Sequence, residues 1–136
     1  MIRAIIIDDE TKGRTALRAK IQAYCPQIKI IAEASSAQDA ILLIQQHKPQ
    51  LIFLDIEMPR MNGFEMLNAL KEKNFYIIFT TAYDQYAIKA IKYSAFDYLL
   101  KPITLERLMK AVNKISNVQA VDIKEEQQVV DNQGFV

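Results

Sequence analysis

The chain has 136 residues, of which 51% are hydrophobic and 24% are charged, so its length and composition suit one folded, water-soluble domain. Its net charge is +1, which excludes the strongly basic balance of a polyanion-binding protein. The single cysteine, Cys25, excludes an internal disulfide, and the single histidine, His47, argues against a zinc site built from histidines. Because the sequence contains neither a transmembrane-length apolar run nor a signal-peptide pattern, we expect a cytoplasmic protein with no membrane partner.

Short β-branched runs alternate with amphipathic patterns in the first part of the chain. The apolar run Ile2–Ile7 is typical of a strand that is buried on both faces. A helix is predicted over Thr11–Tyr24, and a second strand over Ile28–Ala34. Ser36 then has the position of an N-cap for a further amphipathic helix.

The second part of the chain continues this alternation. A third strand is predicted over Leu51–Ile56, and the loop after it contains Gly63, for which we expect a positive φ. The remaining elements are, in order, a helix that carries Phe64, Leu67 and Leu70, a strand over Tyr76–Thr81, a helix over Asp84–Tyr93, a strand over Phe96–Leu100 and a last helix capped by Thr104. Five βα units predict an α/β fold, with a parallel sheet, right-handed crossovers and helices on both faces.

The helical pattern fades at about Asn117. We therefore expect one domain over residues 1–116. Residues 117–136 are predicted to form a linker or extended arm that leads toward an output domain absent from this sequence.

Polar side chains follow the predicted strands at their carboxyl ends, where parallel sheets bind ligands. The first strand ends in Asp8 and Asp9, and the third ends in Asp55. The fourth ends in Thr81, and the fifth is followed by Lys101. Three carboxylates, a hydroxyl and an ammonium group are therefore expected to converge at one edge of the sheet.

Such a cluster fits a hard divalent cation together with a phosphoryl group. Mg²⁺ prefers oxygen ligands, and its charge offsets the repulsion between packed carboxylates. Asp55 is then the candidate nucleophile for aspartyl-phosphate chemistry, while Thr81 and Lys101 bind the other phosphoryl oxygens.

Four motifs carry a resemblance to a known family. IIIDDE, LIFLDIEMPRMNG, FTTAY and AFDYLLKPI resemble, in this order, the receiver domain of two-component response regulators, the CheY-like superfamily. The resemblance covers residues 2–116. It implies a flavodoxin-like, doubly wound sheet of order 2-1-3-4-5. It also implies a signalling domain that is not an enzyme and whose only chemistry is its own phosphorylation and dephosphorylation.

The resemblance implies a role for each residue of the acidic cluster. Asp55 matches the phospho-acceptor, Asp9 the direct Mg²⁺ ligand, and Asp8 the acid that holds metal-bound water. The backbone carbonyl of Glu57 matches a further metal ligand, and its side chain is expected to line the same pocket and to influence how fast the phosphoryl group is lost.

The resemblance also implies a switch. Thr81 matches the switch hydroxyl, Tyr98 the aromatic residue that turns inward on activation, and Lys101 the lysine that pairs with the phosphoryl group. Pro102 matches a proline that is usually preceded by a cis peptide. The phosphoryl group is expected to draw Thr81 inward and to shift the population toward an active arrangement.

A longer run, TTAYDQYAIKAIKYSAFDYLLKPI, resembles the receivers of LytTR (LytR/AlgR)-type regulators. This narrower resemblance implies a transcription regulator that binds DNA only through its output domain. The resemblance to receiver domains further implies a sensor histidine kinase as phosphoryl donor, and we expect a homodimer that forms on phosphorylation through the region of the fourth and fifth βα units.

Simpler interpretations stay open at single positions. Thr81 is also a reasonable helix cap, Tyr98 a core residue and Lys101 a surface residue. A solvated pair of loop acids is the simpler interpretation of Asp8 and Asp9.

Three other classes of protein fit the sequence less well. A haloacid dehalogenase-like phosphatase would carry its nucleophile on the first strand and a second Asp two residues later, whereas Asp8 and Asp9 are adjacent. A flavodoxin-type cofactor binder is disfavoured because these acids repel a flavin phosphate. A pseudo-receiver that binds partners without phosphorylation is disfavoured by the complete set of acids, threonine and lysine.

Overall fold

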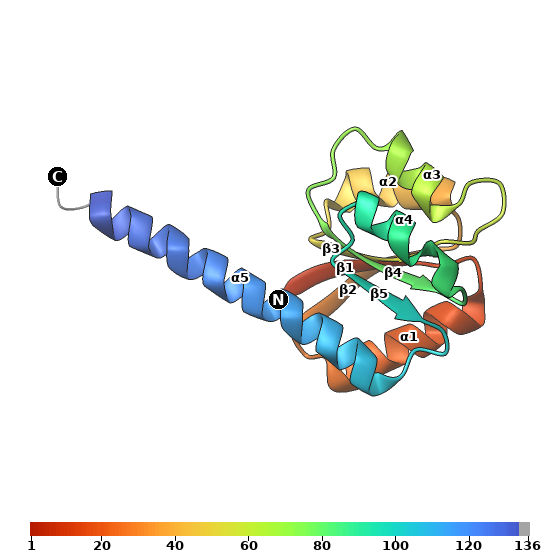
Figure 1. Ribbon diagram of the computed structural model, residues 1–136, viewed down its shortest axis with the longest axis horizontal. Helices are drawn as coiled ribbons and strands as arrows, with labels where there is room; N and C mark the ends of the chain where they lie inside the picture. The colour runs from red at the N-terminus through yellow and green to blue at the C-terminus, as the bar shows by residue number, and fades with distance from the viewer. Residues whose placement is uncertain (134–136) are drawn as a thin grey trace.

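The computed structural model describes the backbone of residues 1–133 and the side chains of residues 1–119. Its sheet consists of β1 (Ile2–Ile7), β2 (Ile28–Ala34), β3 (Leu51–Asp55), β4 (Tyr76–Thr81) and β5 (Asp97–Leu100). All neighbouring strands are parallel and lie in the order β2-β1-β3-β4-β5 (Figure 1). The flavodoxin-like topology predicted from the sequence is thereby confirmed.

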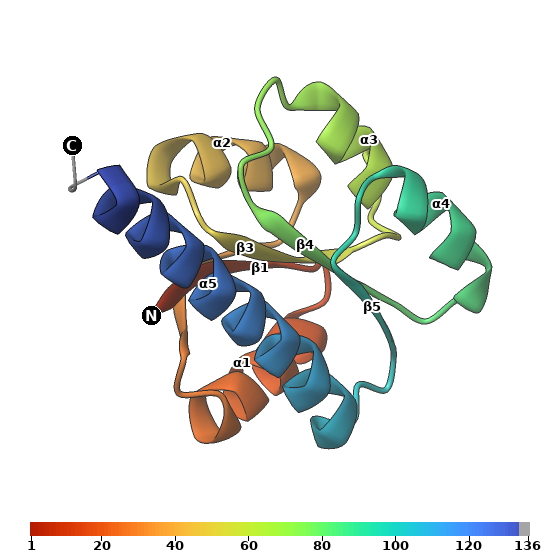
Figure 2. The same cartoon turned by 60° about the vertical axis from the view of Figure 1, so that its left-hand side comes forward.

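Helices cover both faces of the sheet (Figures 1 and 2). They are α1 (Thr11–Tyr24), α2 (Ala37–His47), α3 (Gly63–Ala69), α4 (Ala87–Lys92) and α5 (Leu105–Gln133), with a 3₁₀ turn, η1 (Asp84–Tyr86), before α4. Helices α1 and α5 pack on one face, and α2, α3 and α4 pack on the other. Two apolar cores result, one on each side of the sheet.

Strand β1 shows why the sheet lies between two cores. Ile5 and Ile7 belong to the core under α2, α3 and α4, whereas Ala4 and Ile6 belong to the core under α1 and α5. Side chains of a strand alternate between the two faces, so an unbroken apolar run is stable only where both faces are covered. Each fully buried isoleucine contributes roughly 1.5–3 kcal/mol through removal of apolar surface from water.

The predicted helix starts are confirmed where a capping side chain is present. The hydroxyl of Ser36 accepts a hydrogen bond from the backbone N–H of Asp39 at 3.1 Å. The hydroxyl of Thr104 accepts one from the backbone N–H of Arg107 at 3.2 Å. These bonds satisfy donors that are otherwise unpaired in a first helical turn.

The segment predicted as one helix over Asp84–Tyr93 is instead divided into η1 and the short helix α4. Neither Tyr83, before η1, nor Tyr86, before α4, supplies a side-chain cap. Without a capping side chain, the first turn tightens into a 3₁₀ turn. In such a turn the backbone N–H groups bond to carbonyls three residues away instead of four.

The expectation of a positive φ at Gly63 is wrong. Arg60 takes the positive φ of this loop, at 71°, and none of the glycines within residues 1–133 does. Gly63 is required for a different reason. A Cβ at this position would lie 2.8 Å from the backbone oxygen of Asp55, so only glycine lets the start of α3 approach the end of β3 so closely.

Helix α5 continues to Gln133, beyond Asn117, where the sequence pattern predicted a change to a linker or extended arm. Between these two residues the sequence contains neither glycine nor proline and is rich in Gln and Glu, which favour helix. The helix therefore continues beyond the point at which its apolar stripe fades. Within residues 1–133, no helix combines the length and the apolar character that a membrane span requires.

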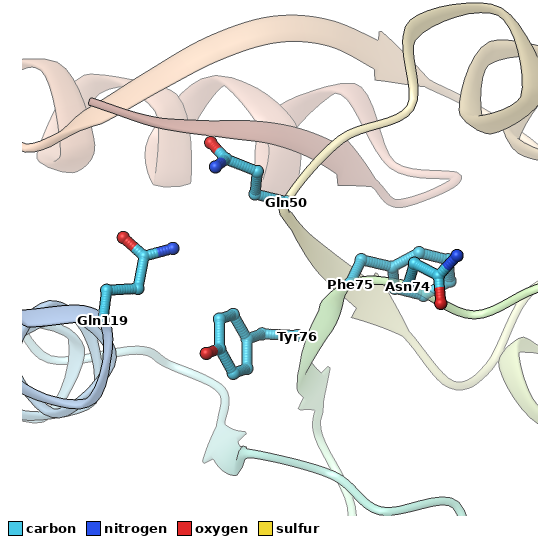
Figure 3. Close-up of a pocket in the computed structure, with 5 residues that line it drawn as sticks. All are labelled: Gln50, Asn74, Phe75, Tyr76 and Gln119. Atoms are coloured by element: carbon cyan, nitrogen blue, oxygen red, sulfur yellow. The ribbon is translucent and has the colours of Figure 1, made fainter. Parts of the chain in front are cut away.

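A recess of about 340 Å³ lies at the amino-terminal end of β4, next to α5. Amide and aromatic side chains line it, namely Gln50, Asn74, Phe75, Tyr76 and Gln119 (Figure 3). Because Tyr76 begins β4 and Thr81 ends it, the recess is at the opposite end of the sheet from the predicted acidic cluster.

Candidate functional site

The strand register brings together the three acids that the sequence analysis selected. Ile7 of β1 pairs with Leu54 of β3, so the residues that follow them, Asp8 and Asp55, lie side by side at the carboxyl ends of these strands. Carboxylate oxygens of Asp8, Asp9 and Asp55 all lie within 4.8 Å of one another. Asp8 and Asp55 are each only 4% exposed, which contradicts the interpretation of Asp8 as a solvated loop acid, whereas Asp9 is partly exposed.

Lys101 provides the positive charge nearest to these acids. Its Nζ lies 2.8 Å from Oδ2 of Asp8 and 3.6 Å from Oδ2 of Asp55. Its backbone N–H donates to the carbonyl of Thr81 at 2.7 Å, and the peptide between Lys101 and Pro102 is cis, as predicted. Burial alone would lower the pKa of the Lys101 ammonium, but the hydrogen bond to Asp8 and the charge of Asp55 raise it, so the side chain stays protonated.

Asp55 is the most strongly perturbed member of the cluster. Burial raises its pKa to about 7, and the charges of Asp8 and Asp9 act in the same direction. Lys101 and a backbone hydrogen bond from Glu57 act in the opposite direction and offset only part of this rise. The ionised form of Asp55 is therefore held in an environment with too little positive charge.

The chemistry of the donor set fits a divalent cation. Three carboxylates against one ammonium leave two negative charges, which a single divalent ion neutralises. All donors are hard oxygens, and no cysteine or histidine belongs to the group, which is the ligand set that Mg²⁺ prefers over zinc or copper.

Gly13 and Arg14 support the cluster and were not selected from the sequence. A Cβ at Gly13 would lie 2.5 Å from Oδ2 of Asp8, so glycine is needed for α1 to pass so close to this carboxylate. Nη1 of Arg14 donates to the backbone carbonyl of Asp8 at 2.7 Å. A glycine inside a predicted helix costs about 1 kcal/mol relative to alanine, and this cost was the available signal that Gly13 has a packing role.

The two predicted switch residues lie on neighbouring strands at the same edge. Thr81 is fully buried, and its hydroxyl accepts a hydrogen bond from the backbone N–H of Tyr83 at 3.2 Å. The hydroxyl of Tyr98 donates to the backbone carbonyl of Tyr83, and its ring packs against the core. Burial raises the pKa of the Tyr98 phenol, which therefore remains a hydrogen-bond donor at neutral pH. Both predicted switch residues thus contact the same loop residue, Tyr83.

Glu57 lies two residues after Asp55 with its side chain exposed. Its backbone N–H hydrogen-bonds to the Asp55 carboxylate. Its Oε1 accepts a hydrogen bond from the hydroxyl of Tyr86 at 2.6 Å. No pattern in the sequence connects Tyr86 with Glu57.

Comparisons with known proteins agree with this geometry. The family model for the response regulator receiver domain matches residues 4–113. An uncharacterized response regulatory protein of Yersinia pestis is 46% identical over 117 residues, which are 85% of this chain and 49% of that protein. The transcriptional regulatory protein BtsR of Escherichia coli K12 is 45% identical over 116 residues, which are 85% of this chain and 48% of that protein. The chain therefore spans about half the length of the curated relatives that it matches.

Solved structures show the same fold. The REC domain of AraT, a response regulator from Geobacillus stearothermophilus, superimposes with a TM-score of 0.79 at 32% identity, over 93% of this chain and 98% of that one. The response regulatory domain of mrkE from Klebsiella pneumoniae superimposes with a TM-score of 0.78 at 28% identity, over 86% of this chain and 97% of that one.

Proposed function

Because the chain belongs to the family of response regulator receiver domains, we propose that Asp55 accepts a phosphoryl group from the phospho-histidine of a sensor histidine kinase. The observation that carries this proposal is the placement of Asp55, buried at the end of β3 beside two further carboxylates and Lys101. The domain acts in signalling, and its chemistry is limited to its own phosphorylation and dephosphorylation.

The transfer uses the side chains of the cluster in distinct roles. A carboxylate oxygen of Asp55 attacks phosphorus, the N–P bond of the phospho-histidine breaks, and its electron pair stays on the imidazole of the kinase. Lys101 binds a phosphoryl oxygen and leaves its present contact with Asp8 to do so. Asp8, Asp9 and Asp55, with the backbone carbonyl of Glu57, would hold Mg²⁺, which when bound neutralises charge on the carboxylates and on the transferring group.

The phosphoryl group then changes the loop between β4 and α4. Thr81 donates its hydroxyl to a phosphoryl oxygen and gives up its present bond to the N–H of Tyr83. Tyr98 is bound to the carbonyl of the same residue, so a displacement of Tyr83 changes the contacts of both switch side chains. The arrangements of this loop with and without the phosphoryl group therefore make different contacts and differ in free energy. Such a difference is what a population shift requires.

The output of this switch lies outside the domain. We place the receiver in residues 1–116 and propose that residues 117–136 lead toward a DNA-binding output domain of the LytTR type. Two observations support this proposal, namely that the curated relatives are about twice as long as the chain and that BtsR is named a transcriptional regulatory protein. The protein then regulates transcription in the cytoplasm, and DNA is a partner only through that output domain.

We further propose that phosphorylation drives homodimerisation through the region of α4 and β5. Ile88 and Ile91 of α4 are 76% and 75% exposed, and Leu100 at the end of β5 is 46% exposed. Large apolar side chains exposed together on one face favour a protein partner over water.

The deciding measurement is the intact mass of the protein after incubation with acetyl phosphate. We expect a single phosphoryl adduct on the native chain that requires Mg²⁺ and is absent from Asp55→Asn. A stable adduct on Asp55→Asn would show that another residue is the acceptor. Sustained turnover of a phosphoester substrate would instead indicate a phosphatase.

A further inference from the structure

Tyr86 determines where the carboxylate next to the acceptor lies. Glu57 is bound at both ends, since its backbone N–H reaches the Asp55 carboxylate and its Oε1 accepts the Tyr86 hydroxyl at 2.6 Å. Among the residues whose side chains are described, no lysine or arginine forms an ion pair with Glu57. The orientation of this exposed carboxylate therefore depends on one hydrogen bond from a neutral donor.

The ring of Tyr86 is fixed by aromatic contacts that do not involve its hydroxyl. It packs edge-on against Phe64, with ring centroids 6.0 Å apart, and Phe64 is only 2% exposed. It also meets the ring of Tyr83 at an interplanar angle of 87°. Removal of the hydroxyl alone therefore leaves the ring in place and releases only the Glu57 carboxylate.

We propose that Tyr86 is a positioning residue that holds the Glu57 carboxylate aside and so prolongs the life of the phosphoryl group on Asp55. This inference rests on the proposed function. Hydrolysis requires a water molecule to attack phosphorus while the bond between phosphorus and the Asp55 oxygen breaks, its electron pair returning to the Asp55 carboxylate. The proton of that water must pass to a base, and a released Glu57 is a carboxylate two residues from the acceptor that takes it.

The position of Tyr86 connects this effect to the switch. The ring of Tyr86 contacts Tyr83, whose backbone binds both Thr81 and Tyr98. A rearrangement of that loop on phosphorylation therefore alters the hydrogen bond between Tyr86 and Glu57. The same segment therefore influences both how long the phosphoryl group persists and which arrangement the switch adopts.

The test is the rate of phosphoryl loss. The native chain, Tyr86→Phe and Tyr93→Phe are phosphorylated with acetyl phosphate and Mg²⁺, freed of donor, and followed by intact mass. Tyr93 is the matched control, because its ring also packs on Phe64 but its hydroxyl binds Asn68 at 3.1 Å. We expect loss of the phosphoryl group to be about 3–10-fold faster in Tyr86→Phe and unchanged in Tyr93→Phe. This factor is smaller than the full effect of a general base.

A second pair of variants tests whether the effect passes through Glu57. In a Glu57→Gln background the amide is no base, so adding Tyr86→Phe leaves the rate of loss unchanged. An equal rate in native protein and Tyr86→Phe, or the same acceleration in both backgrounds, overturns the inference while phosphorylation itself proceeds normally. Failure of the native chain to take up any phosphoryl group would instead refute the proposed function, and this inference with it.

Discussion

Two clusters of charged side chains lie at opposite ends of the parallel strands, and they are balanced in opposite ways. Around Asp97, one carboxylate meets two cations, Arg107 and Lys114. At the acidic site, three carboxylates meet the single ammonium of Lys101. The charge of Asp97 is balanced by basic side chains of the protein, whereas the acidic site has a deficit of positive charge.

The pKa values of the two central carboxyls reflect this difference. Burial alone would raise the pKa of Asp97, but hydrogen bonds from Arg107, the backbone N–H of Tyr98 and Lys114 lower it overall. Burial raises the pKa of Asp55 to about 7, with help from its acidic neighbours. The two carboxyls thus differ both in burial, which is greater for Asp55, and in the charge of their neighbours, which is positive around Asp97 and mostly negative around Asp55.

Removal of Lys101, the cation that pairs with the carboxylates of the acidic site, should have the largest effect. Lys101→Ala leaves three carboxylates together, and we expect a loss of about 3 kcal/mol in the free energy of unfolding without metal. Mg²⁺ should restore most of this loss, because it replaces the missing charge. Denaturant unfolding with EDTA and with Mg²⁺ measures both values.

Lys114→Ala is the matched control for this substitution. Lys114 is 49% exposed, and Asp97 keeps Arg107 as a partner, so the expected loss is below about 1 kcal/mol and independent of Mg²⁺. Equal losses for the two lysine variants would mean that the clusters do not differ in balance.

Neutralising the central carboxyl should change stability in opposite directions at the two clusters. Asp55→Asn removes a buried charge from an acidic environment, and we expect the metal-free protein to gain about 2 kcal/mol in the free energy of unfolding. Asp97→Asn removes a charge that its neighbours favour, and we expect a loss of about 1 kcal/mol. Thermal unfolding in EDTA at neutral pH measures both, and a loss in Asp55→Asn would contradict the deficit of positive charge.

Gly13→Ala should sharpen the comparison, because it acts on the acidic cluster alone. The new Cβ displaces the Asp8 carboxylate, and we expect Mg²⁺ affinity to fall about tenfold, or 1.4 kcal/mol. Titration with Mg²⁺, followed by calorimetry, measures this change. Thr15→Ala, at an exposed position of the same helix, should leave the affinity unchanged. A Gly13→Ala variant with native Mg²⁺ affinity and a more stable helix would show that α1 has room for the methyl group.

The smallest expected effect is on the acid limb of the stability profile. The pKa of Asp97 is lower in the folded protein than in the unfolded chain, so the unfolded chain binds its proton first as the pH falls. The advantage of the native chain over Asp97→Asn, about 1 kcal/mol, is therefore complete above the unfolded pKa of about 3.9 and lost as the pH falls through the lower folded value. Urea unfolding of both proteins across this range measures the difference.

The parts of the site that follow from strand order were predictable. Asp8 and Lys101 come directly after strands and Asp55 ends one, and the carboxyl ends of parallel strands meet at one edge whatever the loops do. The contacts of Gly13, Gly63 and Tyr86 were not predictable in the same way. Each depends on how closely two segments far apart in sequence approach, and neither periodicity nor turn chemistry encodes that distance.

The extent of α5 was missed for a related reason. An apolar stripe identifies where a helix packs, so the pattern faded where the packing stopped, near Asn117. Intrinsic helix propensity carried the backbone on to Gln133 without that stripe.

Helix α5 has a mechanical consequence for the signal that we propose to begin at Asp55. Its 29 residues form a rod about 44 Å long, since each residue adds about 1.5 Å along the axis. Its first turns pack beside β5, and its far end extends well beyond the sheet (Figure 1). A tilt of about 10° at the base moves the far end of a 25 Å overhang by about 4 Å, without any change of its internal hydrogen bonds. The helix thus converts a small angular change at the domain into a displacement at its far end. That displacement is large enough to alter the contacts of any domain attached there.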